Sequence, residues 1–208
     1  MLSLTKIKLA LQMPDFDSKT AQYKMAPVPR IMNRPPQKTV QPRVCSVLLL
    51  LFYKNNTLFL LLTKRHNELQ YHPGQISLPG GHQENKESLL ETALRETREE
   101  VGISPNALTI LGKLESVYIP SSDFIIHPFV AWHEGTPAFK HNPQEVEGMI
   151  NVQVCNLLNP ENRGKEREKK DSHYVTVPYF KIGNHKVWGA TAMILSEFVE
   201  RIKTLNVR

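Results

Sequence analysis

Three glutamates near the end of a predicted helix are the residues whose spacing most directly indicates chemistry. Glu96, Glu99 and Glu100 stand at positions i, i+3 and i+4, so they share one face of a helix. Like charges at these spacings repel each other, and the negative end of the helix dipole disfavours anions there. An ordinary solvated acidic face does not explain two unfavourable placements at once. A hard divalent cation does, because clustered carboxylates bind Mg²⁺ or Mn²⁺, often with substrate phosphates completing the shell.

The segment that carries these acids is predicted to be a loop followed by a helix with a defined C-terminal end. Gly80 and Gly81 open it, where they let the backbone approach a metal ion, and Gly102 closes it as a C-terminal cap. Apolar or small residues recur at three- and four-residue steps and predict the buried face of this helix: Leu90, Ala93, Leu94, Thr97 and Val101.

The elements around this helix are predicted to form a sheet. Two apolar runs, residues 44–52 and 58–63, flank a polar turn and predict a hairpin whose two faces are both covered. Pro128 is expected to mark a sheet edge or a bulge. A short helical turn is expected at residues 155–158, and a final helix at 190–205. Further strands are predicted at residues 76–79, 108–111, 116–119, 124–132, 149–154, 175–182 and 186–188.

The 208 residues suffice for one domain with an additional arm. We assign residues 1–42 to an N-terminal arm, with one short helix and a proline-rich lead-in, and residues 43–208 to a single α/β domain. Residues 161–171 are almost wholly charged, which predicts a mobile surface loop.

Composition narrows the class of protein. Hydrophobic residues make up 40% and charged residues 22% of the chain, as is usual for globular proteins. The net charge of +6 suits an anionic substrate, while the lack of a long Lys/Arg block argues against nucleic acid as a partner. The two cysteines, Cys45 and Cys155, predict a reduced, cytoplasmic protein. No apolar run reaches about 18 residues, so no membrane span is predicted.

Residues 81–103 resemble the Nudix box, a pattern of glycines, acids and one arginine at fixed spacing. Thr97 takes a position that is usually apolar. The matching residues are Gly81, Glu87, Arg95, Glu96, Glu99, Glu100, Gly102 and Ile103. The resemblance implies an α/β/α sandwich with a mixed central sheet and a loop–helix–loop box. It also implies Mg²⁺- or Mn²⁺-dependent hydrolysis of a nucleoside diphosphate linked to another group.

The resemblance implies roles for single residues as well. Glu96 and Glu100 are expected to hold the metal with the carbonyl of Gly80, and Glu99 to be a further ligand or a catalytic residue. The expected structural brace of the box is Glu87, Arg95 and Gly81. The general base is expected to be either a box glutamate or a glutamate on a distant loop, where Glu145 and Glu147 are candidates and surface acids are the alternative.

A second resemblance lies upstream, where residues 61–65 and 72–81 are similar to the signature of coenzyme A diphosphatases. That Nudix subfamily splits coenzyme A into 3′,5′-ADP and 4′-phosphopantetheine. Lys64, Arg65 and His72 are the candidates for binding substrate phosphates. Three residues depart from the signature: His66 replaces a small residue, Gln70 an arginine, and Leu78 an aromatic residue.

Two alternatives to coenzyme A hydrolysis stay open at this stage. The first is the same chemistry on ADP-ribose, NADH or a dinucleoside polyphosphate. The second is a non-catalytic Nudix module that binds nucleotide or RNA. Such modules typically lose box glutamates, and all of these glutamates are present here. The sequence does not define the oligomeric state, and a homodimer is compatible with it.

Overall fold

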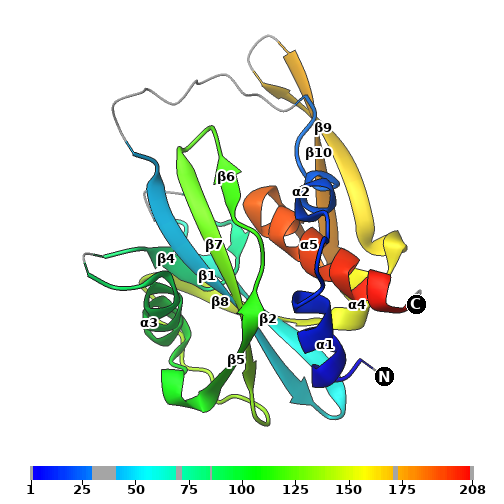
Figure 1. Ribbon diagram of the computed structural model, residues 1–208. Helices are drawn as coiled ribbons and strands as arrows, with labels where there is room; N and C mark the ends of the chain where they lie inside the picture. The colour runs from blue at the N-terminus through cyan, green and yellow to red at the C-terminus, as the bar shows by residue number, and fades with distance from the viewer. Residues whose placement is uncertain (1, 30–40, 69–71, 85, 171–172, 207–208) are drawn as a thin grey trace.

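The computed structural model describes residues 2–29, 41–68, 72–84, 86–170 and 173–206 (Figure 1). Its helices are α1 (Leu4–Leu11), α2 (Ser18–Tyr23), α3 (Leu89–Val101), α4 (Val154–Leu158) and α5 (Gly189–Asn206), with 3₁₀ turns at Pro105–Ala107 and Pro160–Asn162. Its strands are β1 (Arg43–Lys54), β2 (Thr57–Arg65), β3 (Ile76–Ser77), β4 (Gly80–His82), β5 (Leu108–Lys113), β6 (Val117–Ile119), β7 (Phe124–His133), β8 (Val146–Gln153), β9 (Arg163–Lys170), β10 (His173–Ile182) and β11 (His185–Trp188).

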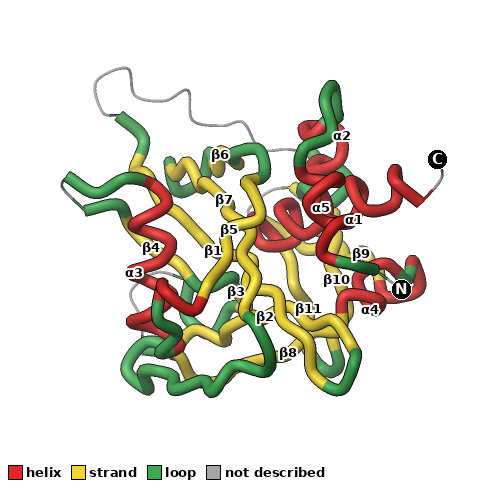
Figure 2. The backbone as a smooth tube through the Cα atoms, turned by 60° about the horizontal axis from the view of Figure 1, so that its bottom comes forward, coloured by secondary structure: helices red, strands yellow, loops and turns green. Residues whose placement is uncertain are grey.

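The central sheet is mixed, as predicted. Its main order is β3-β2-β1-β7-β5, with β8 beside β2, β4 beside β1 and β6 beside β7. Strands β1 and β7 run parallel, while the other strand pairs are antiparallel. Helix α3 covers one face of the sheet, and α1 and α5 cover the other (Figures 1 and 2). The predicted sandwich of helices around a mixed sheet is therefore confirmed.

Both faces of strand β1 are apolar because each face packs against a buried core. Leu48, Leu50 and Phe52 are fully buried in the core beneath α3. The alternate residues Leu49 and Leu51 are fully buried in the larger core beneath α5. Each such side chain stabilises the fold by roughly 1.5–3 kcal/mol. The predicted hairpin is also confirmed, with Leu51 opposite Leu60.

Pro128 does not lie at a sheet edge, which is one of the two places predicted for it, and the irregularity of pairing nearby falls between Ile110 and Gly112 of β5. Its strand, β7, lies inside the sheet, between β1 on one side and β5 and β6 on the other. Pairing on this second side runs to Ile126 against β6 and resumes at Phe129 against β5. Pro128 falls at this change of partner, where a missing N–H group is tolerated. Its carbonyl still accepts a hydrogen bond from the Leu114 N–H at 2.9 Å.

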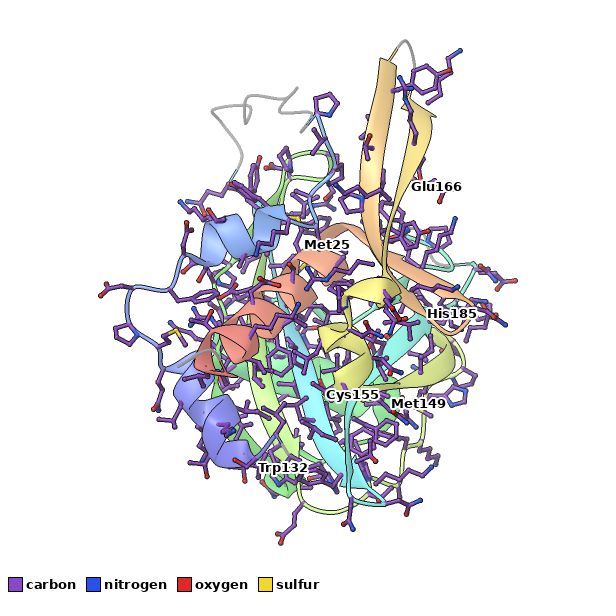
Figure 3. The ribbon with its side chains drawn as sticks, turned by 90° about the vertical axis from the view of Figure 1, so that its right-hand side faces the viewer. Met25, Trp132, Met149, Cys155, Glu166 and His185 are labelled. Carbon is purple, nitrogen blue, oxygen red and sulfur yellow. The ribbon has the colours of Figure 1, made fainter. Side chains whose placement is uncertain are left out.

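The charged segment predicted to be a mobile loop is instead strand β9. It forms a second sheet of order β11-β10-β9, and the β9–β10 hairpin projects beyond the other elements near Glu166 (Figure 3). The charges are accommodated because long side chains pack along the strand pair while their charged ends stay in water. The Arg167 guanidinium lies 4.3 Å from the ring centroid of Tyr174, and Lys186 forms an ion pair with Glu166.

The N-terminal arm carries two helices rather than the single one predicted. Helix α1 begins at the N-cap Ser3 and buries Ile7 and Ala10 in the same core as α5. Helix α2 begins at the N-cap Asp17. Residues 30–40 of the proline-rich lead-in lie outside the described residues. Among the described helices, none is long and apolar enough to cross a membrane.

Candidate active site

Helix α3 forms where the sequence predicts it. Ser88 and Glu91 make a capping box: the Ser88 side chain accepts from the Glu91 N–H, and the Glu91 carboxylate accepts from the Ser88 N–H. The helix ends at Gly102 as predicted. Thr97, the unusual residue of the apolar face, is fully buried, and its hydroxyl donates to the Ala93 carbonyl at 2.7 Å. The hydroxyl is therefore satisfied within the helix.

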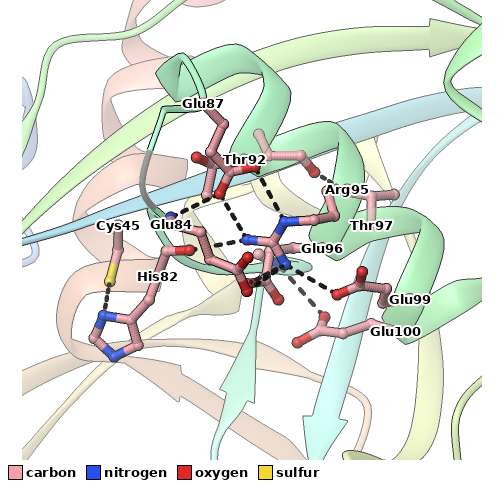
Figure 4. A network of polar contacts seen from close by, with 12 residues as sticks. Cys45, His82, Glu84, Glu87, Thr92, Arg95, Glu96, Thr97, Glu99 and Glu100 are labelled. Carbon is pink, nitrogen blue, oxygen red and sulfur yellow. Dashed lines mark hydrogen bonds and ion pairs between the residues drawn. The ribbon is translucent and has the colours of Figure 1, made fainter.

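Arg95 joins the loop to the helix (Figure 4). Its Nε and Nη2 atoms donate to the two carboxylate oxygens of Glu87 at 3.1 and 2.9 Å, and Nη2 also donates to the His82 carbonyl at 3.0 Å. The Arg95 hydrogen bonds lower the pKa of Glu87 to about 2. Nη1 reaches the carboxylates of Glu96 and Glu99, each at 3.0 Å. Arg95 thus links Glu87 and His82 of the loop to Glu96 and Glu99 of the helix, which is the geometry of a structural brace.

Glu96, Glu100 and Glu145 converge on one point, and their ligand oxygens lie within 4.8 Å of one another. Glu100 is 3% exposed. The Gly80 N–H donates to its Oε2 at 3.3 Å, and Arg65 Nη1 lies 3.9 Å from its Oε1. Burial raises the pKa of Glu100 to about 8 and also raises that of Glu96. Below about pH 8 the metal-free Glu100 carboxyl therefore keeps its proton, which a bound cation would displace.

Glu145 reaches the cluster because its loop is fastened to both α3 and β2. The Asn142 N–H donates to the Glu100 carbonyl at 2.9 Å, and the His66 N–H donates to the Glu145 carbonyl at 2.8 Å. The Asn142 side chain donates to the Glu145 carboxylate at 3.2 Å. Strand β8 then begins and pairs with β2. A carboxylate 45 positions beyond Glu100 is in this way held opposite it.

Close approach requires glycine at both predicted positions. A Cβ atom on Gly81 would lie 2.4 Å from the Glu96 carboxylate. A Cβ atom on Gly80, whose φ is +149°, would lie 2.3 Å from the Ser46 carbonyl oxygen. Any larger residue would therefore displace the acid cluster or strand β1.

The residues predicted to bind substrate phosphates do not all lie at the same place. Arg65 and His72 line a cavity that also includes Gly80 and Gly81. Burial lowers the pKa of His72. Lys64 forms an ion pair with Glu147 at 2.5 Å, both partly exposed.

Glu99 is more exposed than the other box acids. Its side chain is 43% exposed and forms an ion pair with Arg95, and it is not part of the convergent group formed by Glu96, Glu100 and Glu145. Of the residues that depart from the subfamily signature, His66 positions Glu145 through its backbone, and Leu78 is buried and lines the cavity. Gln70 lies outside the described residues.

The cavity next to the acid cluster has a volume of 510 Å³. Cys45 and Val47 of β1 form part of its lining, and Trp188 and the start of α5 form another part. Ala26 and Pro27 of the N-terminal arm also line it. The sequence analysis missed these last two residues because no local pattern links them to the box.

A divalent cation fits this donor set. The cluster supplies three carboxylates, and carboxylate oxygens are the ligands that Mg²⁺ and Mn²⁺ take. Burial without full neutralisation is costly for a carboxylate, and a cation would remove that cost. Among the described residues, this is the group of acidic, histidine and cysteine side chains that converges closely enough to hold an ion.

Comparison with known proteins agrees with this geometry. The NUDIX domain family matches residues 42–175. The mitochondrial coenzyme A diphosphatase NUDT8 of Homo sapiens is 31% identical, over 79% of this chain and 69% of that protein. The Nudix hydrolase NudL of Yersinia enterocolitica is 32% identical, over 69% of this chain and 73% of that protein.

Solved structures show the same fold. A MutT/nudix family protein from Enterococcus faecalis superposes with a TM-score of 0.58 at 16% identity, covering 98% of this chain and 76% of that one. An Ap4A hydrolase from C. elegans superposes with a TM-score of 0.52 at 15% identity, covering 79% of this chain and 98% of that one. At these identities the likeness concerns the fold alone.

Proposed function

The chain belongs to the Nudix hydrolase family, and from this premise we propose that it cleaves the diphosphate bond of coenzyme A or its thioesters. The products are 3′,5′-ADP and 4′-phosphopantetheine or its acyl derivative. The observation that carries the proposal is the convergence of Glu96, Glu100 and Glu145 beside a cavity that Arg65 and His72 also line. The identity to a coenzyme A diphosphatase over most of both chains supports this choice of substrate.

We propose Glu96 and Glu100 as the carboxylates that hold Mg²⁺ or Mn²⁺, with the Gly80 carbonyl and Glu99 as further ligands. A bound divalent cation neutralises diphosphate oxygens and makes water a better nucleophile. Gly81 leaves room for the Glu96 carboxylate, and Arg95 holds that carboxylate in place from the other side. Glu87 anchors Arg95, so its role is structural.

Hydrolysis requires a base that removes a proton from the attacking water, whose oxygen bonds to phosphorus as the bridging P–O bond breaks. We assign this role to Glu145 in preference to Glu99. The Glu145 carboxylate faces Glu96 and Glu100, whereas Glu99 is directed to Arg95. Replacing each by glutamine separates them: Glu145→Gln should lower kcat by a larger factor than Glu99→Gln. The reverse pattern would transfer the role to Glu99.

We propose that Arg65 and His72 bind the phosphates of the substrate. Arg65 lies between the cavity and Glu100, and its buried Nε has no hydrogen-bond partner among the described residues. An anionic substrate would supply that partner. Lys64 adds positive charge nearby once it exchanges Glu147 for a phosphate.

A panel of diphosphates tests the substrate. Coenzyme A, acetyl-coenzyme A, ADP-ribose, NADH and a dinucleoside polyphosphate are offered at equal concentration with Mg²⁺ or Mn²⁺, and products are read by mass. We expect 3′,5′-ADP from coenzyme A at the highest kcat/KM. Dominant cleavage of ADP-ribose would reject the substrate but not the chemistry. Absence of cleavage throughout would favour a binding module.

A cytoplasmic location stays a proposal, supported by Cys45 and Cys155, which are both free thiols. Subcellular fractionation of the tagged protein tests it, and recovery in a membrane-bounded organelle would overturn it.

A further inference from the structure

Part of the cavity lining comes from outside the part of the chain that matches the NUDIX domain. The match covers residues 42–175 and contains the acid cluster. Ala26 and Pro27 come before it, and Met193 and Ile194 of α5 come after it, yet all four line the same cavity. The acid cluster therefore lies within the matched part, while one wall of the neighbouring cavity is contributed by segments on either side of it in the sequence.

The arm is fastened where it forms this wall. Ala26 and Pro27 form a strap whose next residue, Val28, exchanges two backbone hydrogen bonds with Thr176, at 2.9 and 2.8 Å, which ties the strap to β10. On the N-terminal side of the strap in the sequence, the Ser196 hydroxyl of α5 donates to the Ala21 carbonyl of α2 at 2.7 Å. Figure 3 shows Met25 beside α5, and this side chain is 2% exposed.

A buried polar cluster holds the strap more firmly. Gln22 Nε2 donates to the Glu197 carboxylate at 2.8 Å and to the Glu115 carbonyl at 2.9 Å. The Glu115 N–H donates back to Glu197 at 3.2 Å. Glu115 lies just before β6, whose Tyr118 and Ile119 also line the cavity. Glu197 thus fixes two parts of the wall relative to each other.

This wall is mainly apolar. Ala26, Pro27, Met193 and Ile194 offer no hydrogen-bond donor from their side chains. The Thr191 hydroxyl beside them already donates to the Ile76 carbonyl at 3.2 Å. Their surface can stabilise CH₂ groups by burial but cannot replace the hydration of a nucleobase edge or a phosphate. A ligand that reaches from the acid cluster to this wall needs an extended, largely apolar group beyond its diphosphate.

We propose that the strap Ala26–Pro27 is a specificity-determining part of the substrate site, which selects diphosphate esters carrying an aliphatic chain. The inference rests on the proposed function, because the chain must extend from a diphosphate held at the acid cluster. In coenzyme A the pantetheine arm supplies that chain, with its dimethyl and CH₂ units as the apolar groups that can pack on the wall and its amide groups left to water or other polar atoms. The strap of the protein therefore lowers KM for substrates that carry such a chain, and it leaves the rate of the cleavage step unchanged.

The test compares two substrates that differ only in the chain: coenzyme A and the methyl ester of 3′-phospho-ADP. Pro27→Asp places a carboxylate in the aliphatic wall. We expect it to raise KM for coenzyme A at least about tenfold and to change kcat/KM for the methyl ester less than about twofold. Val28→Asp is the matched control: Val28 is 61% exposed and does not line the cavity, so both substrates should be unaffected.

A second variant guards against misfolding of the strap. Ile119→Thr adds a hydroxyl to a partly exposed residue of the same cavity lining, outside the strap, so it should raise KM for coenzyme A several-fold and spare the methyl ester. Equal losses on both substrates, or equal effects of Pro27→Asp and Val28→Asp, would overturn the inference and leave the proposed function standing. If the wild-type protein cleaved neither substrate, the proposed function itself would fail.

Discussion

Two buried glutamates on opposite sides of the sheet have opposite surroundings. Glu197 of α5 is 0% exposed and accepts hydrogen bonds from Gln22 and the Glu115 N–H, and Arg201 Nε donates to it at 2.9 Å. Glu100 of α3 is 3% exposed, and its contacts are a Gly80 N–H at 3.3 Å and Arg65 at 3.9 Å. The first carboxylate is fully paired, while the second is not.

The difference separates a structural acid from a site for a ligand. A buried charge with full hydrogen bonding joins segments, as Glu197 joins the arm, β6 and α5. A buried charge with few partners shifts its pKa upward, as Glu100 does, and favours a cation. The following predictions test this contrast, from the largest expected effect to the smallest.

Glu100→Gln should lower kcat by about 10³-fold or more, because it removes a charged metal ligand at the reacting diphosphate. The melting temperature of the metal-free protein should not fall, since burial disfavours the charge that is lost. Steady-state kinetics and thermal melting check both. Glu91→Gln is the control on the same helix, because glutamine also completes a capping box. Near-normal turnover by Glu100→Gln would remove this residue from the metal site.

Arg201→Met should destabilise the fold by about 3–5 kcal/mol, because it leaves the Glu197 carboxylate buried without its charged partner. Urea unfolding measures the loss. Replacing both residues, Glu197→Leu with Arg201→Met, should recover part of the stability. If Arg201→Met cost less than about 1 kcal/mol, the description of Glu197 as a structural acid would be wrong.

The metal-free protein should respond to pH through Glu100. Its pKa is about 8 in the folded state against an ordinary 4.5, so its contribution to stability is full below pH 4.5 and is lost as the pH rises to 8. The melting temperature should therefore fall more between pH 5 and pH 8 in the wild type than in Glu100→Gln. Added Mg²⁺ should restore more stability at pH 8, because binding displaces the proton. Parallel curves for the two proteins would contradict this assignment.

Lys64→Met should have the smallest effect on stability, below about 1 kcal/mol, because its ion pair with Glu147 is partly exposed. KM for coenzyme A should rise several-fold if Lys64 attracts the phosphates. Unchanged KM at low ionic strength would limit Lys64 to a surface ion pair.

Local pattern was enough to predict the elements that carry most of the site. Helix α3 follows from its apolar spacing and closing glycine, and the β1–β2 hairpin follows from two apolar runs around a polar turn. The same approach failed for β9, because a run of charges is compatible with a strand once a partner such as β10 is present. Local sequence contains no information on that partner.

The sequence by itself determined that Glu96, Glu99 and Glu100 share one helical face, since that depends only on the period of the helix. Tertiary structure decided how each of these acids is placed. It buried Glu100 and left Glu99 at the surface, brought Glu145 across from a separate loop, and placed Ala26 and Pro27 in the lining of the neighbouring cavity. The physical reason is that burial and pKa depend on contacts between residues far apart in the chain, which the local spacing of residues does not specify.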